Sequence, residues 1–170
     1  GQKLSELERV SSRNRMTELL AELVREVEVN EADVVAYLIL GRLRPLYDSL
    51  EFGLAEKQVQ KAVARVTEKD LGEVVSVYKK EGDLGEVVEG LLKSGPSRLT
   101  VVEVHKILER IAKESGAGSQ ERKLVGLASL LGDLDGLSAK YVVRIVLGKL
   151  RLGFSDKTLL DAVSWAYRGD

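Results

Sequence analysis

The stretch MTELLAELVREV, residues Met16–Val27, decides the fold class. Its apolar side chains recur at steps of three and four residues, which places them on one stripe of an α-helix. The members of this stripe are Met16, Leu19, Leu20, Leu23, Val24 and Val27. Ser12 precedes the stripe, and its side-chain oxygen can accept a hydrogen bond from a first-turn amide, so it is the predicted N-cap. The stretch therefore predicts an amphipathic helix that buries one face.

The same spacing recurs along the rest of the chain. It predicts further helices over Asn30–Leu43, Ala55–Val66, Asp70–Lys80, Leu84–Lys93, Val101–Lys113, Gln120–Leu131, Ala139–Lys149 and Asp156–Tyr167. N-caps are expected at Asn30, Ser119, Ser138 and Ser155, and a Thr-x-x-Glu capping box at Thr100. No stretch alternates apolar and polar residues between turn signals, as a β-hairpin requires. We therefore expect an all-α, compact multi-helix domain with no sheet.

The composition excludes several classes of protein. The chain has 170 residues, of which 44% are hydrophobic, which is enough for a core. It has no Cys and a single His, so disulfides, thiolate metal sites and histidine clusters are excluded. Its apolar runs are far shorter than the ~20 residues of a membrane span, and charged residues interrupt the N-terminus where a signal peptide would lie. We expect an intracellular monomer, in the cytoplasm of a prokaryote or the nucleus of a eukaryote, with no membrane partner.

Short glycine-marked linkers separate the predicted helices. None is long enough to act as a flexible tether between domains. We expect residues 1–170 to form a single domain with two helical halves, divided at about residues 93–98, where Gly95-Pro96 interrupts the helical pattern.

Two parts of the chain resemble each other. The string LGRLR at Leu40–Arg44 recurs as LGKLR at Leu147–Arg151, and Phe52–Lys57 matches Leu152–Lys157. The first copy carries seven inserted residues, Pro45–Glu51. This match predicts two pseudo-repeated units, each a helix, a basic glycine-containing loop and a second helix.

The repeated unit has the residue types of a phosphate site. A helix N-terminus offers unpaired amides and a positive dipole, and a glycine lets an anion approach the backbone. In the second copy Lys149, Arg151 and Lys157 flank Gly153. Two such units could hold phosphates on both sides of a duplex groove. A helical hairpin with a glycine C-cap and solvated charges explains the same residues equally well.

The net charge of −1 argues, as a total, against a polyanion-binding protein. The charges are unevenly distributed, however. The stretch Lys140–Lys157 contains five cations and a single acid, Asp156, whereas Glu81–Glu89 contains four acids and no cation. We expect a basic face and an acidic face that cancel in the sum.

The stretch GAGSQERK (Gly116–Lys123) is a Gly-rich turn that leads into a helix, but it lacks the order of a Walker loop. Together with KYVVRIVLGKLRLGFSDKTLLDAVSWA (Lys140–Ala166), it resembles the N-terminal DNA-binding domain of ATP-dependent DNA ligases of the archaeal and eukaryotic replicative types. Leu40–Lys57 looks like the first repeat of that family, and Ser11–Val24 like its opening helices. The resemblance covers nearly the whole chain.

The resemblance implies an all-helical domain that binds the minor groove of nicked duplex DNA through phosphates and helps a catalytic core to encircle the nick in replication, repair and recombination. Carried over position by position, it implies DNA contacts at Gly118, Ser119, Lys123, Gly148, Lys149, Arg151, Gly153, Lys157, Arg42, Arg44, Gly53 and Lys57. Ser12 and Arg13 are further candidate backbone contacts. The implied partners are nicked double-stranded DNA and the catalytic core of the parent ligase.

The chain departs from that family in its chemistry. Such ligases attack ATP with the lysine of a Lys-x-Asp-Gly motif, but the only Asp-Gly here is Asp135-Gly136, with Asp133 in the lysine position. We expect no ligation by this chain alone and no cofactor in it, since ATP and Mg belong to the catalytic core. No adjacent aromatic pair supports a sliding-clamp motif. The alternative function is an α-helical protein-interaction module of a replication or repair assembly.

Overall fold

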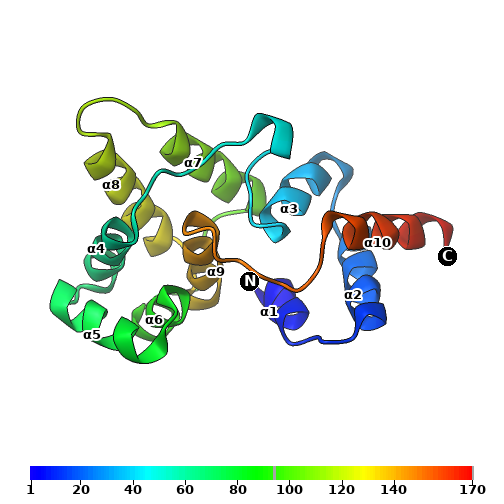
Figure 1. The fold of residues 1–170 in the computed structure, drawn as a ribbon, viewed down its shortest axis with the longest axis horizontal. Helices are drawn as coiled ribbons and strands as arrows, with labels where there is room; N and C mark the ends of the chain where they lie inside the picture. The colour runs from blue at the N-terminus through cyan, green and yellow to red at the C-terminus, as the bar shows by residue number, and fades with distance from the viewer. Residues whose placement is uncertain (94, 170) are drawn as a thin grey trace.

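Ten α-helices and two short 3-10 turns make up the part of the chain that the computed structural model describes, residues 1–93 and 95–169 (Figure 1). The α-helices are α1 (Gln2–Glu8), α2 (Arg13–Glu26), α3 (Ala32–Ile39), α4 (Glu56–Thr67), α5 (Leu71–Glu81), α6 (Leu84–Leu91), α7 (Val101–Lys113), α8 (Ser119–Gly132), α9 (Gly136–Val146) and α10 (Asp156–Arg168). The 3-10 turns are η1 (Val29–Glu31) and η2 (Leu46–Asp48). These residues contain no strand, so the all-α prediction is confirmed.

Three of the predicted helix caps are confirmed. The Ser12 side chain accepts a hydrogen bond from the amide of Arg15, and Ser155 does the same at the start of α10. At α7 the capping box is complete, because Thr100 and Glu103 bond each other's backbone amides. These caps satisfy amides that the first helical turn leaves without partners.

Three other predicted caps are wrong. Asn30 lies within η1 and not at the start of α3. Ser119 is the first residue of α8, after Gly118 in the left-handed conformation at φ 75°. Ser138 lies in the first turn of α9, because the Asp135 carboxylate, three residues earlier, accepts from the Ser138 amide at 2.8 Å and serves as the N-cap.

The helices form two runs, α1–α4 and α7–α10, that pack on each other reciprocally. The second helix of each run packs on the last helix of the other, so α2 contacts α10 and α8 contacts α4 (Figure 1). Likewise the third helix of each run packs on the first helix of the other, α3 on α7 and α9 on α1. Between the runs lie α5 and α6, of which α6 packs on α9 and α4. Each helix of one run therefore packs on a helix of the other run, and α6 adds further contacts to α4 and α9.

A constant spacing in the sequence accompanies this arrangement. Leu147 follows Leu40 by 107 positions, and Leu127 follows Leu20 by the same number. Leu20 and Leu127 are both fully buried, on α2 and α8, within one cluster of buried apolar side chains that draws on both runs. The likeness of the two loops therefore extends back through the preceding helices.

The predicted division at residues 93–98 falls between α6 and α7. Ser94, within it, lies outside the described residues. The reciprocal packing runs across this division, because α1–α4 precede it and α7–α10 follow it.

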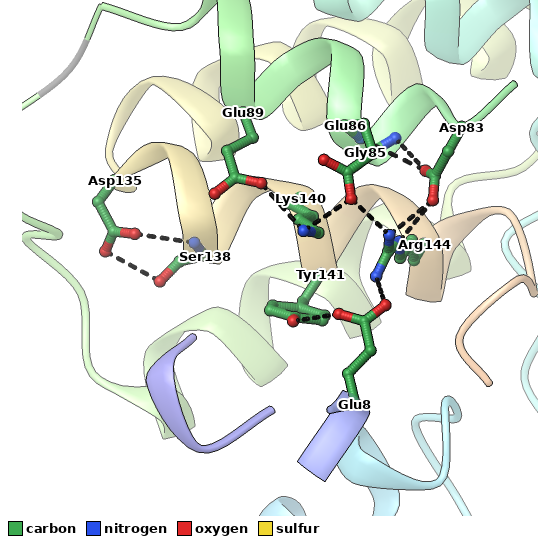
Figure 2. Close-up of polar contacts among 10 residues, drawn as sticks. All are labelled: Glu8, Asp83, Gly85, Glu86, Glu89, Asp135, Ser138, Lys140, Tyr141 and Arg144. Atoms are coloured by element: carbon green, nitrogen blue, oxygen red, sulfur yellow. Dashed lines mark hydrogen bonds and ion pairs between the residues drawn. The ribbon is translucent and has the colours of Figure 1, made fainter. Parts of the chain in front are cut away.

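The expectation of separate acidic and basic faces is wrong, because the two stretches meet where α6 packs on α9 (Figure 2). The Arg144 guanidinium lies 2.6 Å from a carboxylate oxygen of Asp83 and 2.6 Å from one of Glu8. The Lys140 amine lies 2.8 Å from Glu86. Both cations are only 8% exposed. Two of the cations expected on the basic face, Lys140 and Arg144, are therefore buried and paired with carboxylates.

The same network shifts the pKa values of its acidic side chains. Burial acts to raise the pKa of Asp83, but hydrogen bonds and charge from Arg144 outweigh it, so the pKa is lowered. The pKa of Glu8 is lowered in the same way, against burial, by Tyr141 and Arg144. Burial and the hydrogen bond to Glu8 raise the pKa of Tyr141 to about 12. Glu8 and Asp83 are therefore ionised and Tyr141 is neutral at neutral pH.

None of the helices in the described part of the chain is long and apolar enough to cross a membrane. Among the same residues no three His, Cys, Asp or Glu side chains lie together as metal ligands would.

Candidate nucleic-acid interface

The loops that follow α3 and α9 close in the same way. Gly41 and Gly148 each adopt a positive φ, 75° and 66°, and each amide donates to a carbonyl three residues back at 3.0 Å. The next amides, of Arg42 and Lys149, donate to carbonyls five residues back at 3.0 and 2.8 Å. These are the two hydrogen bonds of a Schellman cap, which glycine favours because it adopts the left-handed conformation without strain. Arg42 and Lys149 therefore occupy equivalent positions, each three residues after the last residue of its helix.

A second glycine precedes the next helix in each unit. Gly53 has φ 60° and Gly153 has φ 78°. A Cβ added to Gly153 would meet no atom of the described residues within 4 Å, so its position faces open space. The helix that follows Gly153 begins with the side-chain cap of Ser155, whereas Ala55, the N-cap of α4, provides no side-chain hydrogen bond. The first-turn amides of α4 thus lack a capping side chain at the N-cap position.

A hollow of about 840 Å³ lies where the N-termini of α2 and α10 meet, and we call it the α2/α10 hollow. Its lining includes Ser12, the α2 cap, and the predicted contact Gly153. Three cations also line it, Arg13, Arg151 and Lys157. Two helix N-termini, a glycine and three cations in one concave surface form an arrangement that suits an anion.

The cations of the α2/α10 hollow are mostly free to bind a ligand. Arg151 and Lys157 are exposed and form no ion pair within residues 1–93 and 95–169, although Arg151 donates to the carbonyl of Leu150 at 3.3 Å. Arg13 lies 3.7 Å from Asp161, and both side chains are at least half exposed. Such an exposed pair contributes little and exchanges readily for another partner.

The predicted contact Lys123 is turned inward. Its side chain is 6% exposed, and its amine donates to the backbone carbonyl of Phe52 at 2.6 Å. The neighbouring Gln120, which the sequence analysis missed, donates to the carbonyl of Gly53 at 2.9 Å. Lys123 follows Met16 by 107 positions, and Met16 is also buried. These contacts attach the N-terminus of α8 to the loop before α4, so Gly118 and Ser119 lie near Gly53.

Three other predicted cations are held by carboxylates. Arg42 lies 2.7 Å from Asp156, Arg44 lies 2.8 Å from Glu109, and Lys149 lies 3.1 Å from Glu56. The hydrogen bond to Glu56 raises the pKa of Lys149, and the hydrogen bond to Glu109 raises that of Arg44. Lys57, in contrast, is exposed and forms no ion pair with the described residues.

A second hollow, of about 540 Å³, lies between the two loops, and we call it the loop hollow. The predicted residues Arg42, Arg44, Gly53 and Gly148 line it. The fold therefore gathers seven of the predicted residues into two hollows, Arg151, Gly153 and Lys157 in one and these four in the other.

The chain is similar to known proteins over nearly its whole length. Residues 2–164 match the model of the family described as DNA ligase N terminus. The chain belongs to the DNA ligase N-terminus family. It is 44% identical to a probable DNA ligase of Dictyoglomus thermophilum, covering 94% of this chain and 28% of that protein. It is 40% identical to DNA ligase 2 of Thermofilum pendens, over 96% of this chain and 29% of the relative.

A DNA ligase of Pyrobaculum islandicum is 38% identical and covers 98% of this chain, which spans 30% of that protein. The ligase N-terminal chain described here therefore spans less than a third of the length of these relatives. The family resemblance inferred from the sequence is confirmed by these matches.

Proposed function

We propose that this ligase N-terminal domain binds double-stranded DNA without reading its sequence, through phosphates on both sides of the minor groove. The observation that carries the proposal is the α2/α10 hollow, where Arg13, Arg151 and Lys157 surround two helix N-termini. Phosphate contacts through cations and amides carry no sequence information, so they suit an enzyme that acts at any nick.

The second phosphate run would contact the junction of α8 and α4. Gly118 and Gly53 would offer backbone amides there, and Ser119, whose amide donates to the Gly116 carbonyl at 3.2 Å, would offer its hydroxyl. Lys57 lies in the first turn of α4. Lys149, half exposed, and Gly148 lie on the neighbouring loop. The pseudo-equivalence of the two units supports this second run, because each unit ends a helix, turns at a glycine and starts a helix at the same relative place.

Lys123 and Arg44, which are bonded to other groups of the protein, would not contact phosphate directly. Lys123 is bound to a carbonyl and Arg44 to Glu109, so both would support DNA binding by holding the loops in place. The remainder of the ligase would supply the catalytic core, with ATP and Mg bound there, and this domain would not ligate DNA alone. A domain with a net charge of −1 binds weakly, so tethering to that core would provide avidity.

The test is fluorescence anisotropy with nicked, intact and single-stranded DNA over a range of salt concentrations. Each phosphate contact adds about 0.9 to the slope of log affinity against log salt. We expect Arg151→Ala and Lys157→Ala each to reduce the slope by about that amount. Lys80→Ala, which removes an exposed cation on α5 outside both hollows, is the matched control. A slope unchanged by both hollow variants would contradict the proposal.

A protein-interaction module is the second candidate. Leu46 and Tyr47, on the inserted turn η2, are 72% and 92% exposed, and large apolar side chains at such exposure mark contact surfaces. Binding of a protein partner that depends on these two residues, together with DNA binding indifferent to salt, would favour this function.

A further inference from the structure

Two ion pairs cross between the helical runs at equivalent positions. Arg42, in the loop after α3, pairs with Asp156 in the first turn of α10. Lys149, in the loop after α9, pairs with Glu56 in the first turn of α4. In each pair the cation belongs to one run and the carboxylate to the other.

The two pairs differ in exposure. The Arg42 side chain is 23% exposed, and its Nε is buried without a hydrogen-bond partner in the described part of the chain. The Lys149 side chain is 55% exposed. The Arg42 side chain is therefore partly buried against the protein, whereas the more exposed Lys149 amine can reach an external phosphate.

Arg42 and Asp156 also line different surfaces. Asp156 lines the α2/α10 hollow, together with Arg151 and Lys157. Arg42 lines the loop hollow and is not among the described residues that line the α2/α10 hollow. The Arg42 guanidinium thus holds the Asp156 carboxylate, with Nη2 and Oδ2 2.7 Å apart, although Arg42 lines the other hollow.

Asp156 is an obstacle to phosphate binding at this place. Its carboxylate is 54% exposed, and it lies among the groups that would receive a phosphate. Two negative charges at such proximity repel each other unless a cation neutralises one of them. The same acid stabilises the N-terminus of α10 through the helix dipole, which gives a physical reason for its presence.

We propose that Arg42 is a positioning residue for DNA binding. Its guanidinium neutralises the Asp156 carboxylate, and it contacts no phosphate itself. The proposal rests on DNA binding at the α2/α10 hollow. Lys149, at the equivalent position of the other unit, contacts phosphate directly. The pseudo-repeat thus assigns different roles to two equivalent cations.

The experiment measures the affinity and salt slope of the whole chain for a nicked duplex in three variants, Arg42→Ala, Asp156→Asn and the double variant. We expect Arg42→Ala to bind about tenfold more weakly, equivalent to about 1.4 kcal/mol, because Asp156 is left uncompensated. Asp156→Asn should bind at least as tightly as the unchanged protein. The double variant should recover to within about twofold of the unchanged protein, with its full salt slope.

The equivalent pair provides the matched comparison. Lys149→Ala should reduce the slope by about 0.9, one phosphate contact, and adding Glu56→Gln should not restore it. Thermal unfolding by circular dichroism checks each variant, and Arg42→Met, which keeps the buried stem, replaces Arg42→Ala if that variant fails to fold.

Three results would overturn the inference. A double variant as weak as Arg42→Ala, with the slope reduced by about 0.9, would make Arg42 a direct phosphate contact. Equal losses in all three variants, in step with unfolding temperature, would make the pair purely structural. Asp156→Asn weaker than the unchanged protein would contradict the neutralising role. Failure of the proposed function would be visible in the unchanged protein itself, whose DNA binding would then show no salt dependence. The three results above are therefore distinguishable from that failure.

Discussion

Replacing Lys123 by Met tests whether this residue touches DNA or supports the loop before α4. The amine is buried and donates to the Phe52 carbonyl at 2.6 Å. Met is the residue at the equivalent position of α2, Met16, which is buried to a similar degree. The change therefore removes one charged hydrogen bond and keeps a side chain that this fold already accommodates.

The magnitude follows from that single bond. A hydrogen bond to a charged group contributes about 1.5–3 kcal/mol, and loss of its donor leaves the Phe52 carbonyl unsatisfied. Removing a buried ammonium recovers part of that cost, since a charge is no longer held away from water. We expect Lys123→Met to lower the free energy of unfolding by about 1–2 kcal/mol, measured by urea denaturation.

The effect on DNA binding distinguishes the two roles. An amine that faces the protein interior neutralises no phosphate, so the salt slope should stay unchanged although the affinity falls. Lys57→Ala, an exposed cation near the same loop, is the control and should reduce the slope by about 0.9. A slope reduced as much by Lys123→Met as by Lys57→Ala would refute the reasoning.

Two further predictions concern the hollow and the buried network. Gly153→Asp should weaken DNA binding by about tenfold or more, because it adds a carboxylate beside the cations. The strain at φ 78° should lower the free energy of unfolding by about 1–2 kcal/mol, and loss of the folded state would show a structural role instead. Arg144→Met should lower the free energy of unfolding at pH 7 by about 3 kcal/mol in urea denaturation, because it leaves Glu8 and Asp83 without their shared cation. Since the pKa of each carboxyl is lowered in the folded protein, this stabilisation is present above their ordinary values and is lost as the pH falls through the folded values. The difference between Arg144→Met and the unchanged protein should therefore shrink in acid, and a difference independent of pH would contradict this account.

Nine of the ten α-helices in the described part of the chain and the two basic loops could be predicted because their signals are local, whereas α1 (Gln2–Glu8) was not predicted. The apolar spacing of Met16–Val27 and the repeated LGRLR and LGKLR strings each lie within a few turns of chain. Caps were less predictable where two acceptors compete, as at Asp135 and Ser138, because spacing alone does not rank a carboxylate over a hydroxyl.

The state of the candidate site residues depends on distant partners. Lys123 bonds a carbonyl 71 positions away, and Arg42 pairs with a carboxylate 114 positions away, so no local pattern distinguishes them from the free Lys157. The basic and acidic stretches likewise look like opposite faces until α6 packs on α9. The constant spacing of 107 positions was present in the sequence, and extending the loop match back through Ser12 and Ser119 would have revealed it.

The reciprocal packing of α1–α4 and α7–α10 also has a consequence for biosynthesis. A chain is made from its N-terminus, and α2 meets its partner α10 only after residues near 168 have left the ribosome. The growing chain therefore holds the apolar stripe of α2 without its final cover until the end of this segment. Contacts between residues so distant in sequence also slow folding, because a long loop must close before they form. The α2/α10 hollow, built from the second helix of the first run and the last helix of the second run, is thus among the last surfaces that the newly made chain completes.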